Sequence, residues 1–135
     1  MPTFDNPAVD AAEAQQALRG LAHATRAIND PQQIYSVLGS LSQAVASLEQ
    51  SLHQLATYHD GPMRRRASIS GDPKDRRAAA HRISWELHHA GEILRQVATA
   101  LDRAHEVEAE IAYGQRNFPE VSELPCTTGD RSLEL

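Results

Sequence analysis

The chain has 135 residues, a formal net charge of -5 at pH 7 and one cysteine. This length suits one domain, and a lone cysteine excludes an internal disulfide and a multi-cysteine zinc site. Alanine and leucine, the strongest helix formers, dominate the apolar residues, and no stretch reaches the roughly 18 consecutive apolar residues of a membrane-spanning helix. The first ten residues carry neither a charged leader nor an apolar stretch. We therefore expect an all-α protein of the cytoplasm with no membrane partner.

A first helix is predicted over residues 10–29, after an irregular arm at residues 1–9. Its apolar positions recur three and four residues apart, which is typical of one stripe on a helix. Asp30 and Pro31 then supply a capping side chain and the residue tolerated at the first helical position. We therefore expect a second helix to start at once, so that the two helices form a tight hairpin. The stripe consists of Ala11, Ala14, Leu18, Leu21, Thr25 and Ile28.

The second helix is predicted over residues 31–58 and repeats the same spacing. Gly39 lies inside it and costs roughly 1 kcal/mol relative to alanine, so we expect a neighbouring element to pack closely there. From residue 60 to residue 72 the pattern stops, and glycine, proline and serine residues indicate a connector. The apolar stripe of this helix consists of Ile34, Leu38, Leu41, Val45, Leu48, Leu52 and Leu55.

The third helix is predicted over residues 73–113, because Asp72 and Pro73 repeat the capping signal. At 1.5 Å per residue it is about 60 Å long. Beyond it, residues 114–135 contain proline and glycine without helical spacing, so they are expected to form an irregular tail outside a helical domain of residues 1–113. The third stripe consists of Ile83, Leu87, Ala90, Leu94, Val97, Leu101 and Ala104.

Together these elements predict an antiparallel three-helix bundle with one very long C-terminal helix and coiled-coil spacing. The three predicted helices are about 28, 42 and 60 Å long, so a single chain leaves the ends of its longer stripes with too few neighbours. Exposed apolar stripes usually mark an interface. We therefore expect a second copy of the chain to complete the core, through Leu52, Leu55, Leu101, Ala104, Val107 and Ile111.

The order of charges supports pairing of the third helix with its own copy. Residues 1–59 carry a net charge of -3, residues 60–82 of +4 and residues 83–135 of -6. Basic residues therefore begin the third helix and acidic residues end it, opposite to the order that the helix dipole favours. An antiparallel homodimer would place the basic start of one copy against the acidic end of the other. The alternative is that both charged regions are simply solvated.

A run of seven cations suggests an alternative partner. These residues lie on the predicted connector and the start of the third helix, where they could bind nucleic-acid phosphates. The acidic total and the absence of aromatic residues between the cations argue against that interpretation. Ser68 follows two of the arginines as in basophilic kinase sites, and a phosphate there would offset nearby positive charge. The cations are Arg64, Arg65, Arg66, Lys74, Arg76, Arg77 and Arg82.

A second face of the third helix carries the only tryptophan of the chain. Trp85 is a candidate anchor for a protein partner, because tryptophan is enriched at binding hot spots, and the alternative is that the arm or the tail covers it. His81, His88 and Glu92 share this face.

Histidine and glutamate also occur four residues apart on two of the predicted helices. Glu49 with His53 and His88 with Glu92 are such pairs, but two ligands make a weak metal site. Glu86 and His89 form a Glu-x-x-His spacing that has no second copy in the chain. We therefore predict neither a metal nor a cofactor.

No nucleophile with a neighbouring base and no glycine-rich phosphate loop is recognisable. The sequence thus favours a non-enzymatic, homo-oligomeric helical interaction or scaffold protein, with an accessory nucleic-acid-binding protein as the alternative. Twelve arginines against one lysine are typical of a GC-rich bacterial genome. The identity of a protein partner does not follow from these residues.

Overall fold

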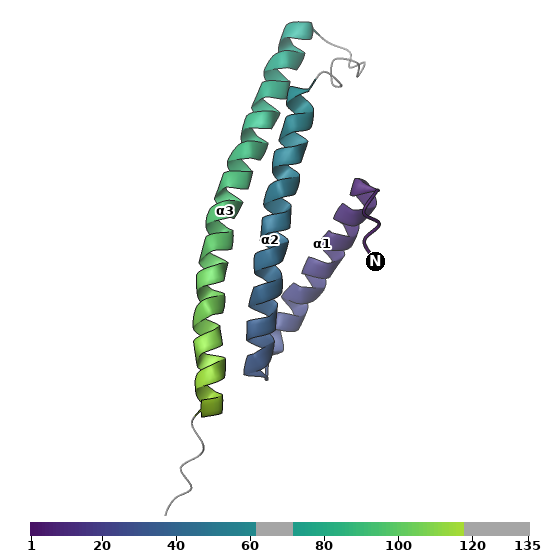
Figure 1. Ribbon diagram of the computed structural model, residues 1–135. Helices are drawn as coiled ribbons and strands as arrows, with labels where there is room; N and C mark the ends of the chain where they lie inside the picture. The colour runs from purple at the N-terminus through teal and green to yellow at the C-terminus, as the bar shows by residue number, and fades with distance from the viewer. Residues whose placement is uncertain (62–71, 118–135) are drawn as a thin grey trace, which may run out of the picture.

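A computed structural model describes residues 1–61 and 72–117. Within these ranges the chain forms three α-helices and a short 3₁₀ turn, without strands, as Figure 1 shows. The all-α class predicted from the sequence is confirmed. The predicted tail from residue 118 onward and most of the connector lie outside the described residues.

Helix α1 spans Pro7–Ala24 and begins three residues earlier than predicted. Its start is fixed by Asn6, whose side-chain oxygen accepts a hydrogen bond from the Val9 N–H at 3.2 Å, and by Pro7 at the first helical position. The arm before it is irregular, as expected, but it is tied to the helix. The Thr3 N–H donates to Asp10 Oδ1 at 2.6 Å, and the terminal amine contacts Glu13 at 3.0 Å.

Helix α2 spans Pro31–Asp60 and follows the 3₁₀ turn Thr25–Ala27. Asp30 caps it as predicted, because its Oδ1 accepts from the Gln32 N–H at 2.9 Å. Helix α3 spans Pro73–Asn117, and Asp72 caps its start by accepting from the Lys74 N–H at 3.0 Å. With 45 residues, α3 is about 68 Å long. It continues past Gly114, so the predicted end at residue 113 was too early.

Helices α2 and α3 pack side by side as an antiparallel hairpin, whereas α1 leaves the turn at an angle on the far side of α2 (Figure 1). Among the described residues, α1 makes no close backbone approach to α2 or α3, and none of its residues is buried. Its stripe explains this, because Ala11 and Ala14 offer little apolar area beside Leu18 and Leu21. Helix α1 is thus present as predicted but is not packed along α2 and α3 as the predicted three-helix bundle required.

The helices α2 and α3 differ in length, and α3 projects past the end of α2. The Ser84 hydroxyl donates to Asp60 Oδ2 at 2.9 Å, which places the end of α2 level with Ser84. Residues 73–83 of α3 therefore extend beyond α2, as Figure 1 shows. This projecting segment has no helical neighbour among the described residues.

Candidate interaction surface

The residues that join α2 to α3 are small or polar, and we call them the contact seam. They recur four and three residues apart on each helix, one residue after the apolar stripe predicted from the sequence. Ala56 is 0% exposed, and Ser42, Ser84 and Gly91 are also buried. The seam consists of Gly39, Ser42, His53, Ala56 and Asp60 on α2 and of Ser84, His88, Gly91, Asp102 and His105 on α3.

Two glycines of the contact seam each receive a histidine ring from the opposite helix. A Cβ atom at Gly91 would lie 2.6 Å from His53 Nε2, and one at Gly39 would lie 3.1 Å from His105 Nε2. The His105 ring also stacks on Tyr35, with 4.3 Å between ring centroids. The predicted close packing at Gly39 is confirmed, because a Cβ atom there would be in tight contact with the His105 ring.

Hydrogen bonds between side chains link the two helices near both ends of the seam. Ser42 donates its hydroxyl proton to Asp102, and Ser84 donates to Asp60 at the other end. Every buried side-chain nitrogen or oxygen in the described part of the chain has a partner. The seam therefore buries polar groups at low cost, since each is hydrogen-bonded.

About two turns before the end of α2, the two Glu/His pairs singled out from the sequence come together. His53 Nδ1 and His88 Nδ1 are 2.7 Å apart, so one ring donates a proton to the other. His53 Nε2 lies 3.9 Å from carboxylate oxygens of both Glu49 and Glu92. Residues 1–61 and 72–117 nevertheless contain no group of three or more such side chains placed to hold a metal ion.

The leucine-rich residues of α2 and α3 lie beside the contact seam, and we call them the apolar face. On each helix they stand one residue before the seam, which rotates them by about 100°. Because the helices are antiparallel, this rotation carries both stripes to the same side of the hairpin. The apolar face consists of Leu38, Leu41, Val45, Leu48, Leu52 and Leu55 on α2 and of Ile83, Leu87, Ala90, Leu94, Val97, Leu101 and Ala104 on α3.

Burial varies across the apolar face. Leu52, Leu87 and Leu94 are half-buried, whereas Leu55 is 51% exposed and Val97 is 40% exposed. No large side chain in the described part of the chain is fully buried. The hairpin thus presents a broad apolar surface without having completed a core of its own.

The opposite side of the hairpin, which we call the polar face, carries serine, threonine and glutamine from both helices. Trp85 lies on this side and is 57% exposed. Its ring stacks on His89, with 5.0 Å between centroids. Of the residues grouped with Trp85 from the sequence, His81 is exposed, whereas His88 turns toward His53 in the seam. The structure therefore divides the predicted partner site between two surfaces. Residues of the polar face include Ser40, Gln43, Ser47, Gln50, Gln54, Gln96 and Thr99.

The residues predicted for a dimer interface are accessible. Leu52 and Leu101 are half-buried within the apolar face. Leu55 and Ala104 are exposed at its edge. Val107 and Ile111 are exposed on α3 beyond the residues that define the face.

The basic residues predicted as a nucleic-acid site fall in two places. Lys74, Arg77 and Arg82 are exposed, and Arg76 is partly buried, on the projecting start of α3. Arg64, Arg65, Arg66 and Ser68 lie outside the described residues.

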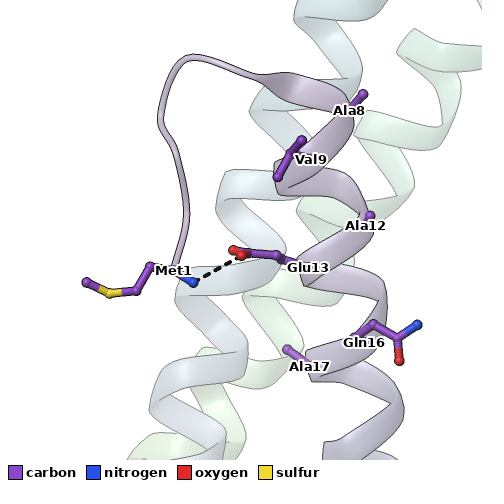
Figure 2. Close-up of a pocket in the computed structure, with 7 residues that line it drawn as sticks. All are labelled: Met1, Ala8, Val9, Ala12, Glu13, Gln16 and Ala17. Carbon is purple, nitrogen blue, oxygen red and sulfur yellow. Dashed lines mark hydrogen bonds and ion pairs between the residues drawn. The ribbon is translucent and has the colours of Figure 1, made fainter.

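A shallow pocket lies between the N-terminal arm and α1, as Figure 2 shows. It is lined mainly by alanines and by Val9, and the ion pair between the Met1 amine and Glu13 crosses it. Close by, the Thr3 N–H holds the pKa of Asp10 below its usual range, helped by the Phe4 N–H. The pocket brings together no set of reactive groups, and its hydrogen bonds serve to hold the arm.

None of the helices in the described ranges has the length and apolar content needed to cross a membrane. The chain matches no known protein-family model. It matches no curated protein and no solved structure. Arguments about its function therefore depend on the surfaces described above.

Proposed function

We propose that this protein is a non-enzymatic helical scaffold that acts as a homo-oligomer. The observation that carries the proposal is the apolar face, which extends along both helices of the hairpin while none of the large side chains that the structure describes is fully buried. Exposed apolar surfaces of this kind usually mark binding sites. Association would complete a core that the single chain leaves open.

The energetics of a small helical protein favour the same conclusion. Domains are stabilised by only about 5–15 kcal/mol, and burial of apolar side chains is the main favourable contribution. Leu48, Leu55 and Val97 remain between 40% and 51% exposed in the single hairpin, so part of that contribution is not obtained. Burying one leucine or valine contributes roughly 1.5–3 kcal/mol, so pairing of two apolar faces would add substantially to stability.

A non-enzymatic role is supported by how the polar side chains of the seam are used. Ser42 and Ser84 are buried between the helices, and each donates to a carboxylate across the hairpin. A nucleophile needs an open position where a substrate atom can approach. These hydroxyl groups have no such space, so their role is to hold α2 against α3.

Sedimentation of the full chain at micromolar concentration and low salt tests this proposal. We expect a species with at least twice the mass of the 14.8 kDa chain, dissociating on dilution. A chain that remains monomeric across the concentration range would contradict the proposed scaffold.

A second candidate function is nucleic-acid binding, favoured by the basic projecting start of α3. Lys74, Arg77 and Arg82 are exposed there beyond the end of α2, so they can approach a phosphate backbone without moving the hairpin. A gel shift at low salt with wild type and with the Lys74→Ala, Arg77→Ala, Arg82→Ala variant tests it. Each lost phosphate contact should reduce the logarithmic salt slope by about 0.9 on duplex DNA. No shift with wild type would remove this candidate.

A further inference from the structure

We propose that the partner on the apolar face is a second copy of the same hairpin, with the two α3 helices packed antiparallel about a twofold axis near Glu92. This inference rests on the proposed homo-oligomeric function and specifies which surface pairs and in which direction. The product is a four-helix bundle in which α3 faces α3 over residues 73–111. Because Asp60 lies level with Ser84, Glu92 lies level with Leu52, so α2 faces α2 over residues 44–60.

The length of the apolar face argues against α1 as its cover. Helix α1 has 18 residues, or about 27 Å, whereas the face follows α3 over a longer stretch, from Ile83 to Ala104. Helix α1 also leaves the hairpin on the far side of α2 (Figure 1). A second α3, with 45 residues, is long enough to cover the α3 part of the face from Ile83 to Ala104.

The spacing of the α3 stripe is self-complementary. From Ile83 to Leu101 its members lie four and three residues apart in alternation, so their order is the same when read from either end. Inverting the helix about Glu92 therefore places apolar residues of one copy level with apolar residues of the other. A C2 interface requires this kind of self-complementary surface. The pairs brought level are Ile83 with Leu101, Leu87 with Val97, and Ala90 with Leu94.

Antiparallel pairing also places a helix of the second copy beside the projecting segment of α3. Residues 73–83 extend past α2, and Ile83 is exposed there. Antiparallel pairing about Glu92 brings residues 101–111 of the second copy alongside this segment. Ile111 and Ala104, exposed in the single chain, then lie next to the projecting start of the partner helix.

Charges agree with the antiparallel direction. The projecting start carries Lys74 and Arg77, and the end of α3 carries Glu108 and Glu110. Pairing about Glu92 brings Lys74 level with Glu110, so charges of opposite sign share the same end of the bundle. Parallel pairing would instead place like charges together, which is unfavourable and opposes association.

Sedimentation equilibrium with two matched double variants tests which face pairs. In Leu48→Glu, Val97→Glu, two exposed residues of the apolar face become carboxylates. In Gln54→Glu, Gln96→Glu, the same two charges are added to exposed positions on the polar face. We expect the first variant to dimerise at least about 100-fold more weakly, because each substitution acts in both copies, and the second to dimerise as wild type.

Each outcome has a distinct meaning. If wild type is monomeric, the scaffold proposal and this inference both fail. If wild type is dimeric but the apolar-face variant is unchanged, or the polar-face variant dissociates equally, only the pairing surface assigned here is wrong. If circular dichroism shows that Leu48→Glu, Val97→Glu has lost helix content, the double variant Leu48→Ala, Val97→Ala is measured in its place, since alanine preserves the helix. That variant should dimerise about 10-fold or more weakly, and unchanged dimerisation would overturn the inference.

Discussion

The two sides of the α2–α3 hairpin are built from the same helices but differ in chemistry. The apolar face carries leucine, isoleucine and valine, none of which is fully buried, and the polar face carries serine, threonine and glutamine around Trp85. Between them, the contact seam joins the helices through glycine, serine, histidine and aspartate. The difference shows that one set of residues holds the hairpin together and another set forms its apolar surface.

This separation has a physical benefit. Buried polar contacts of fixed geometry favour one register of two helices over others. The Ser42–Asp102 and Asp60–Ser84 pairs require Ser42 to face Asp102 and Asp60 to face Ser84 at the same time. Leucines placed in the seam would give less control over register. With the seam polar, the leucines remain available for a partner.

Overpacking the seam should have the largest effect on the single hairpin. Ala56 is 0% exposed, so Ala56→Leu has no space for the added carbons and should lower the free energy of unfolding by about 1–3 kcal/mol. Ala44→Leu, at an exposed position of the same helix, should change it by less than about 0.5 kcal/mol. Urea unfolding followed by circular dichroism compares the two. Equal effects would mean that α2 and α3 do not pack through this seam.

The sequence predicted the helices better than their contacts. Capping by Asp30 and Asp72 and the apolar spacing of three and four residues indicate where α2 and α3 begin and which stripe is apolar, because these signals are local. The prediction that this stripe itself lies between the helices fails, because Gly39, Ser42 and Ala56 allow closer approach one residue later. A second stripe with the same spacing was present in the sequence, but its residues are small or polar.

The His53–His88 contact could not be predicted from the sequence either. Glu49 with His53 and His88 with Glu92 are recognisable as pairs four residues apart, but their meeting depends on the register of α2 against α3. That register is determined by long-range contacts such as Ser84 with Asp60. The sequence does offer one signal for this contact, namely a glycine on one helix that leaves room for a histidine of the facing helix, as Gly91 does for His53.

Glycine-to-alanine substitutions should distinguish packed from unpacked helix surfaces. Gly91→Ala places a carbon 2.6 Å from His53 Nε2, which displaces the ring and should cancel or reverse the roughly 1 kcal/mol that alanine contributes to a helix. Nothing lies within 4 Å of a Cβ at Gly20, so Gly20→Ala should raise helix content. Thermal unfolding and helix content by circular dichroism measure both changes. Stabilisation by Gly91→Ala equal to that by Gly20→Ala would contradict the close approach at the seam.

Coupling between Ser42 and Asp102 should be smaller but measurable. A double-mutant cycle with Ser42→Ala and Asp102→Ala should give a coupling free energy of about 1 kcal/mol, typical of a hydrogen bond between side chains. The same cycle on Ser40 and Asp102 serves as the control, since Ser40 is exposed. Coupling no larger than that of the control would mean that the seam does not depend on this contact.

The smallest effect concerns the N-terminal arm, far from both faces. The Thr3 N–H, followed by the Phe4 N–H, lowers the pKa of Asp10. A lowered pKa in the folded state means that the carboxylate stabilises the arm above its ordinary pKa, and that this contribution is lost as pH falls through the folded value. NMR should show the Thr3 amide resonance shifting at a pH below 3.8, the usual pKa of aspartate. A midpoint at or above 3.8 would argue against the hydrogen bond.

Distances between spin labels across the dimer test the antiparallel pairing of α3 most directly. Labels are attached to Gln96→Cys and, separately, to Glu110→Cys, each with Cys126→Ser to remove the native thiol. Pairing about Glu92 predicts an axial separation of roughly 12 Å for residue 96 and roughly 54 Å for residue 110, at 1.5 Å per residue. Similar distances at the two positions would indicate parallel helices and contradict the account.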